Sequence, residues 1–486
     1  MDSRTAIFRA VARDYAKPAA IVVTPGVAVA ELARRMAEAG AAMALVIGAA
    51  GAPVGIVTEQ DIVRRAAFRV APETPVERVM SAPVETVSGE DRLYAAIARM
   101  RRRARRHMPV VDDAGHVLGV IDLHGALIAG LARTANLIDK LAHEDSLEGL
   151  AAVKAAQVEV ALSLFEEGAA APEIQALLTD INLDIHRRVL RLCEAALDAD
   201  GKGRPPVPYA LIVMGSGGRG ENFLYPDQDN GFVIADHPDA DWAGHDAYFL
   251  ALAERMTVAL DRAGFPLCKG HVMATNRIWR LRLADWTAQI DTWVRRRRGE
   301  EALLADIFFD FRRAAGEARL TDALREHVSA AVAAHPGFLT NMYRIEAEHD
   351  VALGFLGRLS AHRAEDEDAA RVDLKMGGTL PLVEGARLYA LKAGIAETST
   401  LGRLAALRAA DVLSAEEHDQ LGAAFHHVTR VLLREQLSAF RDGRPVGNRV
   451  DPSLLSERER DLLIDSLKAV RAFRARMRDD FGGGVL

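Results

Sequence analysis

Apolar and polar positions near the start of the chain follow the same order twice. Each copy shows a short apolar strand, an alanine-rich amphipathic helix, a second apolar strand, a turn, and a third strand that leads into another helix. The first copy occupies 21–23, 27–39, 43–47 and 55–61, and the second occupies 84–87, 91–105, 108–111 and 119–125. The two Gly-Ile-Val and Gly-Val-Ile runs begin at Gly55 and Gly119, 64 residues apart. The pattern predicts two copies of one small β-α-β-β-α unit.

The stretch from Ala39 to Thr58 holds twenty residues without a charge, which is the length that a membrane span requires. Gly48, Gly51 and Pro53 within it would break a lipid-exposed helix, whereas they suit a turn between two buried strands. We therefore expect two core strands here and no membrane association.

Helical periodicity then continues from 131 to about 198, where the run DADGKGRPPVP ends it. Strand-like YALIVM at 209–214 begins a mixed α/β unit that closes near IFFDFR at 307–312, and the pattern beyond it is helical to the end. The fold class predicted is multidomain α/β plus α. Its parts are a repeated pair at 18–130, a helical connector at 131–205, an α/β core at 206–320 and a helical bundle at 335–486.

Composition narrows the function. The formal net charge of -7 gives no general attraction to nucleic acid. Cys193 and Cys268 are the only cysteines, without a partner pattern, which excludes a disulfide framework and a cysteine zinc site. The N-terminal run MDSRTAIFRAVARDYA has no signal-peptide core. We expect a cytoplasmic protein that binds free nucleotide rather than nucleic acid.

The run GSGGRGENFLYPDQDN at 215–230 carries the candidate chemistry. Its first half also satisfies the dinucleotide-binding fingerprint G-x-G-x-x-G, and Asp236 stands near the position of a ribose-binding acid. A dinucleotide fold, however, needs a crossover helix of several turns after the third glycine. The ten residues at 221–230 leave no room for that helix, so the dinucleotide alternative is disfavoured.

Asp227 and Asp229 stand two residues apart at the entrance of an extended stretch, so both carboxylates project from one face. Two anions held this close are costly unless they share magnesium or manganese, which prefer oxygen ligands and substrate phosphates. In the loop before them, Gly215 permits a close backbone approach, Ser216 offers a hydroxyl and Arg219 can neutralise phosphate charge. The spacing therefore indicates a metal-nucleotide site.

A third carboxylate is expected to complete the site. Asp310 in IFFDFR is the preferred candidate, because its large apolar neighbours predict a buried strand with one acid facing the metal. It would bind one ion and help to deprotonate the acceptor. Asp291 is the rival, although its helical setting favours a structural or surface role.

The N-terminal repeat resembles a tandem pair of CBS domains. The motifs GSGGRGEN…DQDN, CKGHVMATNRIWR, FFDFR and DLKMGG resemble a bacterial nucleotidyltransferase family of the DNA polymerase beta superfamily, similar to the uridylyltransferase of the PII signalling protein. The CBS resemblance places adenine-nucleotide contacts at Thr58 and Asp61, whereas the second copy departs from the pattern with Asp122 and Gly125. At most one such site is therefore expected to be intact.

The resemblance implies transfer of a nucleoside monophosphate, with UMP as the candidate, from a nucleoside triphosphate to a protein acceptor. It also implies AMP or ATP at the CBS pair and a homodimer formed through that pair. Asp373 and Lys375 in DLKMGG fit a helix cap, and by resemblance they would face the acceptor. The alternative hypothesis is a non-catalytic nucleotide sensor or scaffold.

Overall fold

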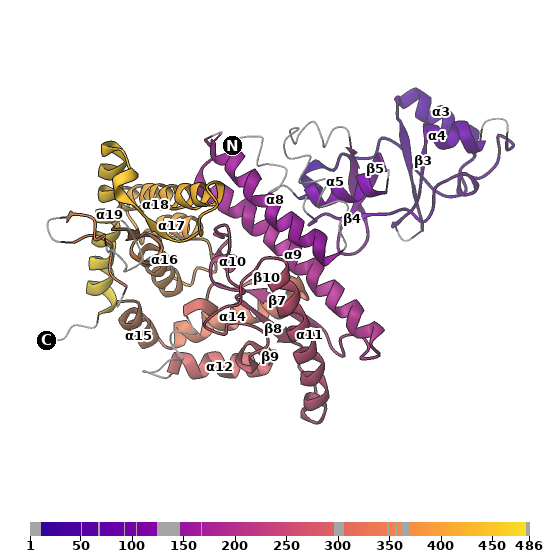
Figure 1. Ribbon diagram of the computed structural model, residues 1–486. Helices are drawn as coiled ribbons and strands as arrows, with labels where there is room; N and C mark the ends of the chain where they lie inside the picture. The colour runs from indigo at the N-terminus through magenta and orange to yellow at the C-terminus, as the bar shows by residue number, and fades with distance from the viewer. Residues whose placement is uncertain are drawn as a thin grey trace. The chain divides into compact units, whose positions relative to one another are not determined.

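A computed structural model of the chain describes residues 11–49, 51–66, 69–91, 93–103, 105–123, 146–166, 168–295, 306–347, 349–354, 357–361 and 370–482. The chain forms two compact units, Met1–Glu144 and Asp145–Leu486 (Figure 1). Gly125, where the second CBS-like copy was expected to depart from the pattern, lies outside the described residues.

The first unit contains two three-stranded sheets of the same design. In each sheet the first strand pairs parallel with the second, and the second pairs antiparallel with the third. Val46 pairs with Gly55 and Val110 pairs with Gly119, so equivalent residues of the two copies occupy equivalent registers. The strands are β1 (Val22–Val23), β2 (Met43–Ile47), β3 (Pro53–Thr58), β4 (Val87–Ser88), β5 (His107–Val111) and β6 (Val117–Asp122). The predicted repeat is confirmed.

Helix α3 (Val29–Ala39) precedes β2 and buries Val29, Leu32 and Met36 at helical spacing. Helix α5 (Leu93–Arg102) has the equivalent place before β5. The uncharged stretch predicted to form two strands and a turn does so as β2 and β3. Within the part of the chain that the structure describes, no helix combines the length and the apolar character that crossing a bilayer requires.

The second unit is built around a four-stranded sheet with the order β10-β7-β8-β9. Strand β7 pairs antiparallel with both β8 and β10, and β8 pairs parallel with β9. The bounds are β7 (Tyr209–Val213), β8 (Asn230–Ile234), β9 (Arg280–Arg282) and β10 (Arg312–Gly316). The antiparallel pairing of β7 with β8 excludes the dinucleotide fold, in which these strands would run parallel.

Side chains alternate across β7 and divide the core between two helical layers. Ala210 and Ile212 face the cluster that includes Trp286 and Phe308, on the side of α12 (Leu283–Arg295) and α14 (Ala318–Ala334). Tyr209 on the opposite face contacts Phe249 of α11 (Trp242–Arg262). Helix α9 (Ala171–Ala199) packs against α11, β10 and the preceding α8 (Leu147–Glu166). Within its described residues, the predicted connector is thus a structural layer of the α/β core.

The C-terminal half is helical, as the sequence predicts. Its helices are α15 (Gly337–Glu346), α16 (Leu380–Lys392), α17 (Thr400–Ala409), α18 (Ala415–Arg441) and α19 (Glu457–Phe481), and β11 (Val372–Asp373) pairs with β12 (Arg449–Val450). Helices α18 and α19 both begin with a capping box, formed by Ser414 with Glu417 and by Ser456 with Glu459.

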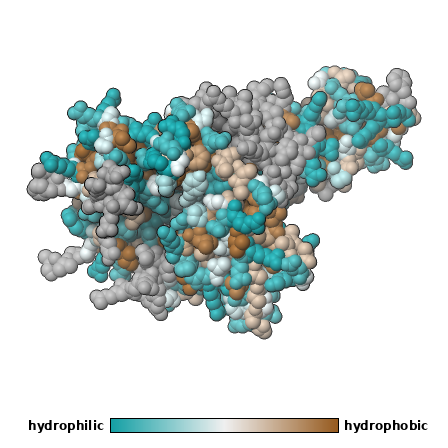
Figure 2. Space-filling model, in the orientation of Figure 1, coloured by the Kyte–Doolittle hydropathy of each residue, from teal (hydrophilic) through white to brown (hydrophobic). Residues whose placement is uncertain are grey.

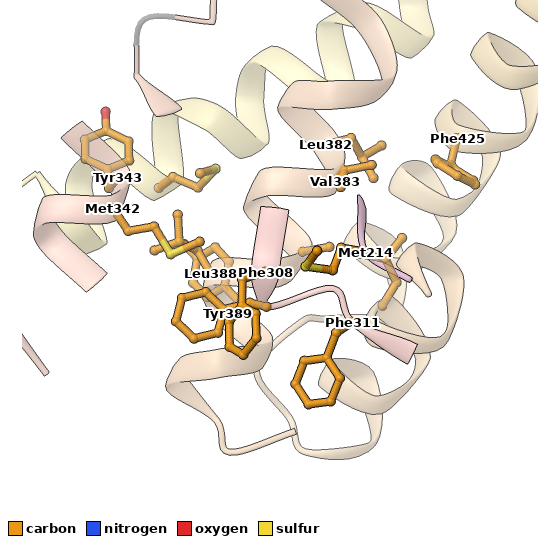
Figure 3. Close-up of a cluster of buried hydrophobic side chains, with 14 of the residues drawn as sticks. Met214, Phe308, Phe311, Met342, Tyr343, Leu382, Val383, Leu388, Tyr389 and Phe425 are labelled. Atoms are coloured by element: carbon orange, nitrogen blue, oxygen red, sulfur yellow. The ribbon is translucent and has the colours of Figure 1, made fainter. Parts of the chain in front are cut away.

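One apolar cluster joins the sheet unit to this bundle. Met214, Phe308 and Phe311 come from the sheet unit, and Leu382, Leu388 and Tyr389 come from α16 (Figure 3). On the face shown in Figure 2, apolar residues are interspersed among hydrophilic ones. Because the sheet unit and the helical bundle share one hydrophobic core, the second unit is a single folded unit.

The segment IFFDFR differs from its prediction. Residues 306–308 are helical, Phe309 and Asp310 form a turn, and β10 begins only at Arg312. The aromatic residues of this segment pack in the core although they do not form a strand. Phe308, for example, stacks on Trp286 and on Phe311. Asp310 is therefore a turn residue.

Candidate functional site

The two acids of the DQDN run stand at the entrance of β8, as predicted. Asp227 is exposed and Asp229 is partly buried, whereas the intervening Gln228 is fully buried. The Gln228 amide donates to the carbonyls of Thr257 and Phe265, which fixes it on the opposite face. This alternation places both carboxylates on one face of the extended segment.

The electrostatic state of Asp229 reflects its surroundings. Burial and, to a smaller extent, the negative charge of Asp227 raise the pKa of Asp229 to about 6. A hydrogen bond from the Cys268 thiol and the charges of Lys375 and Arg219 act in the opposite direction. The acid pair thus carries an electrostatic cost that a cation would relieve.

Two glycines let the loop between β7 and β8 pass close to its neighbours. Gly215 has φ +56°, and a Cβ there would lie 3.0 Å from Oδ2 of Asp229. A Cβ on Gly218 would lie 1.4 Å from the carbonyl oxygen of Asp310, which no rearrangement of a side chain could relieve. The close approach expected at Gly215 is therefore present, and Gly218 is a second position that requires glycine.

A small pocket opens beside the acid pair. Asp227, Asp229 and Pro226 line one side, and Gly217 and Asn222 belong to the loop before them. Asn182, Leu183 and His186 of α9 form another wall, next to Phe265. The pocket combines carboxylates, amides and apolar surface, which is the composition of a small-molecule site.

The residues of α9 that line the pocket were not predicted from the sequence. Their signal was the polar series in DINLDIH, where Asn182 and His186 interrupt a helix face that is otherwise apolar. Both side chains are buried, and Nδ1 of His186 is 2.7 Å from the Asn182 carbonyl. Burial lowers the pKa of His186 to about 4, so its ring is neutral near pH 7.

The guanidinium group of Arg219 is held by carboxylates and is not free to turn toward the pocket. Its Nε donates to Glu221 at 2.7 Å and its Nη1 donates to Asp310 at 2.8 Å. Burial alone would lower the pKa of Arg219, but these two carboxylates raise it overall. Its contacts fit a role in holding the loop, and the predicted role in phosphate binding stays a prediction.

Asp310 is fully buried and surrounded by arginines. Arg219 and Arg387 donate to Oδ2, and Nη2 of Arg403 lies 2.6 Å from Oδ1. Arg387 also binds Glu346 at 3.0 Å. The helical bundle therefore contacts the α/β core through this carboxylate, because Arg387 lies on α16 and Arg403 on α17.

Within the described ranges, no three residues of the types His, Cys, Asp and Glu form a group able to hold a metal. The expected set of Asp227, Asp229 and Asp310 therefore does not form such a group, and the carboxylate of Asp310 is paired with three arginines instead. The rival Asp291 pairs with Arg295 and His327 on the side of α12, consistent with a structural or surface role.

The two candidate residues of the DLKMGG segment make different interactions. Oδ1 of Asp373 accepts hydrogen bonds from the backbone N–H groups of Lys375 and Met376, which is the predicted structural cap. The charge of Lys375 acts on Asp229 and lowers its pKa. Of the two, Lys375 is the residue that the structure associates with the acid pair.

In the first unit, Thr58 and Asp61 bind each other. Oδ2 of Asp61 accepts from the backbone N–H and the hydroxyl of Thr58, and Thr58 Oγ1 accepts from the backbone N–H of Asp61. Ser81 donates to the second oxygen of Asp61 at 3.4 Å. The two residues expected to contact adenine nucleotide thus form one preorganised pair at the end of β3.

Three family models match the chain. Residues 12–67 and 76–130 match the CBS domain. Residues 155–300 match “Putative nucleotidyltransferase DUF294”, and residues 336–481 match “Putative nucleotidyltransferase substrate binding domain”. The transferase model begins within α8, in agreement with the packing of α8 and α9 in the core.

Curated relatives share only a part of the chain. An uncharacterized 17.7 kDa protein of Acidianus ambivalens is 33% identical over 102 residues, which are 21% of this chain and 62% of that protein. An uncharacterized protein of Methanopyrus kandleri is 28% identical over 116 residues, which are 24% of this chain and 59% of that protein. The chain thus spans about three fifths of the length of these two relatives.

Solved structures with similarity include an uncharacterized conserved protein from Pyrococcus horikoshii, at 27% identity and a TM-score of 0.24, covering 26% of this chain and 94% of that chain. Another is a CBS domain protein from Pyrobaculum aerophilum complexed with AMP, at 26% identity and a TM-score of 0.22, covering 24% of this chain and 88% of that chain. The two transferase-family models together cover more than half of the residues and follow a CBS pair. The chain belongs to the CBS-domain-containing family of “putative nucleotidyltransferases” with a C-terminal substrate-binding domain.

Proposed function

We propose that this chain is a metal-dependent nucleotidyltransferase that transfers a nucleoside monophosphate from a nucleoside triphosphate to a hydroxyl group of a protein acceptor. The observation that carries the proposal is the acid pair: Asp227 and Asp229 share one face at the edge of a pocket, and Asp229 packs against Gly215. UMP as the transferred group rests on the resemblance to the PII uridylyltransferase.

The donor set of the pair fits magnesium or manganese. Carboxylate oxygens are the ligands these ions prefer, and burial together with Asp227 already disfavours the Asp229 anion. Magnesium commonly uses one or two carboxylates and completes its shell with water and substrate phosphates, so two acids suffice for binding. The bound ion would neutralise charge on the phosphates and polarise the reacting phosphorus centre.

The transfer forms a bond between the acceptor oxygen and the α-phosphorus. The bond between that phosphorus and the oxygen bridging to the β-phosphate breaks, and pyrophosphate leaves with the electron pair. The proton of the acceptor hydroxyl passes to a carboxylate oxygen of the acid pair. Asp310 is not assigned this proton, because Arg219, Arg387 and Arg403 already surround its carboxylate.

Other residues of the site bind and position. Ser216 offers its hydroxyl to phosphate oxygens, and Gly215 lets the backbone come close to them. Lys375 lies near enough to Asp229 to affect its charge state, and we assign it to the negative charge of the substrate or the acceptor. The CBS pair, through Thr58 and Asp61, would read AMP or ATP and would associate as a homodimer.

The second candidate is a nucleotide sensor or scaffold without transferase activity. The observation that favours it is the position of Asp310, which leaves the acid set at two. The two candidates differ in covalent labelling. An extract of the producing cells is incubated with the purified chain, magnesium and each nucleoside triphosphate labelled at the α-phosphate.

The transferase proposal expects a labelled protein that disappears with the Asp227→Asn and Asp229→Asn variants. Asp291→Asn is the matched control, because it also removes one partly exposed carboxylate but lies outside the site. Labelling that persists in both acid variants would contradict the proposal. Triphosphate binding without labelling would favour the sensor.

A further inference from the structure

A chain of buried hydrogen bonds links α8 to the hydroxyl of Ser216. Nζ of Lys154 donates to Oδ1 of Asn182 at 3.0 Å. Nδ2 of Asn182 donates to Oδ1 of Asn222 at 2.9 Å, and Nδ2 of Asn222 donates to Oγ of Ser216 at 3.0 Å. Four residues, from α8, from α9, from the short helix α10 (Gly215–Arg219) and from the loop after it, are thereby connected in a single line.

Lys154 fixes which group donates and which accepts in every hydrogen bond of this line. Nζ of Lys154 donates both to Asn182 and to the Leu224 carbonyl, so the Asn182 side chain turns its carbonyl oxygen toward Lys154. Its amide nitrogen then faces Asn222, which must in turn present its own oxygen to Asn182 and its nitrogen to Ser216. Ser216 consequently accepts, and its own proton remains available for an outside acceptor. Among the described residues, no other hydrogen bond of the Ser216 side chain competes for that proton.

The surroundings keep the line from rearranging. Lys154 and Asn182 are each 2% exposed and Asn222 is 3% exposed, so water cannot substitute for a lost bond. Lys154 also donates to the Leu224 carbonyl at 3.0 Å, and its Nζ lies 4.4 Å from the centre of the Phe265 ring. The loop itself is tied to α9, because the Asn222 backbone N–H donates to Thr179 at 3.0 Å.

Lys154 is a buried cationic residue that donates hydrogen bonds to Asn182 and to the Leu224 carbonyl. Burial lowers the pKa of its ammonium group to about 7, which shows that the fold makes this charge costly. A methionine would fill a similar volume without that cost. Through Asn182, which lines the pocket, Lys154 orients polar side chains there, and an apolar side chain could not do so.

We propose that Lys154 is a positioning residue that, through Asn182 and Asn222, presents the Ser216 hydroxyl as a hydrogen-bond donor to a phosphate oxygen of the nucleoside triphosphate. The inference rests on the proposed function, since it concerns the same site. It makes the helices before the transferase core part of the phosphate-binding machinery.

The substitution Asn182→Asp reverses the donor and acceptor roles in the hydrogen bonds from residue 182 to Ser216, with almost no change in side-chain shape. An aspartate at this position accepts at both oxygens, so Asn222 must turn its nitrogen inward and its oxygen toward Ser216. Ser216 must then donate inward and can no longer donate to phosphate. Lys154 gains an ionic partner, so the fold is not expected to lose stability.

The experiment measures the dissociation constant of the full chain for magnesium-UTP and magnesium-ATP. Asn182→Asp and Ser216→Ala are each expected to weaken binding about tenfold, the effect of one hydrogen bond to a charged group. In the Ser216→Ala background, Asn182→Asp is expected to add nothing, because both changes remove the same bond. Lys154→Met should also weaken binding, whereas Gln157→Met, a fully buried change on the same helix, should not.

Unchanged binding by Asn182→Asp, or a full additional loss in the Ser216→Ala background, would overturn the inference. The additive result would identify a general effect of the new negative charge instead. Failure of the proposed function has a different signature, which is the absence of magnesium-dependent triphosphate binding by the unaltered chain. The thermal unfolding of each variant reports folding separately from binding.

Discussion

Arg387 of α16 donates a hydrogen bond of 2.7 Å to Asp310, and both side chains are almost completely buried. This contact joins the helical bundle to the segment that immediately precedes β10. Asp310 had the sequence features of a third metal ligand, yet its carboxylate lies between Arg219, Arg387 and Arg403. A structural role and a metal-binding role for this acid make different predictions.

Asp310→Asn is expected to destabilise the second unit by about 3–5 kcal/mol, because it leaves buried guanidinium groups without their counter-charge. Urea unfolding followed by circular dichroism measures this change. Asp291→Asn is the control, and as a partly exposed acid it should change the free energy of unfolding by less than about 1 kcal/mol. A stable Asp310→Asn variant that has lost only magnesium-dependent activity would show that Asp310 acts as a ligand.

Gly218→Ala is expected to displace the nucleotide loop, because the new Cβ would fall 1.4 Å from the Asp310 carbonyl oxygen. We expect a loss of about 1–3 kcal/mol in stability together with weaker triphosphate binding, since backbone must move to admit the methyl group. Gly422→Ala in α18 is the matched control. Its Cβ meets nothing within 4 Å, so better helix propensity should stabilise the chain by up to about 1 kcal/mol. Equal effects of the two changes would contradict this account of the loop.

The buried Lys154 predicts an unusual dependence of stability on pH. Its pKa is about 7 in the folded chain, whereas the ordinary pKa of a lysine side chain is 10.5, so the unfolded chain binds more protons between these values. The free energy of unfolding should therefore rise with pH in this window, by at most about 1.4 kcal/mol per pH unit. His186 is neutral throughout the window, because burial lowers its pKa to about 4.

The measurement compares urea unfolding of the unaltered chain and Lys154→Met between pH 7 and pH 9. Subtracting the two curves removes the contribution of other titrating groups. We expect the difference to change in favour of the unaltered chain as the pH rises. A difference that stays constant over this range would show that Lys154 titrates normally in the folded state.

Much of the fold could be predicted from the sequence because hydrophobic periodicity, and the residues that begin and end helices and strands, are local signals. The strand at 43–47 has the predicted bounds, because Gly40 and Gly48 flank it. The helix Glu457–Phe481 lies in the stretch predicted to be helical and begins at a capping box. The acid pair was predictable for the same reason, because Asp227 and Asp229 are neighbours in sequence and alternate with a buried Gln228.

The partners of Asp310 and Ser216 could not be predicted in this way. Arg387 and Arg403 follow Asp310 by 77 and 93 residues, and no local pattern marks which arginine will reach a buried carboxylate. Likewise, Asn182 precedes Asn222 by 40 residues and belongs to a helix that read as a connector. Long-range polar contacts depend on tertiary packing, which periodicity does not encode.

The measurement that tests the central claim most directly is calorimetry of the full chain with each nucleoside triphosphate, with and without magnesium. The unaltered chain should show binding that requires magnesium, and this binding should be lost in Asp227→Asn and Asp229→Asn. Asp61→Asn, which alters only the pair expected to contact adenine nucleotide in the first unit, should retain it. Magnesium-dependent binding that survives in both acid variants but disappears in Asp61→Asn would contradict the assignment of the nucleotide site to the transferase core.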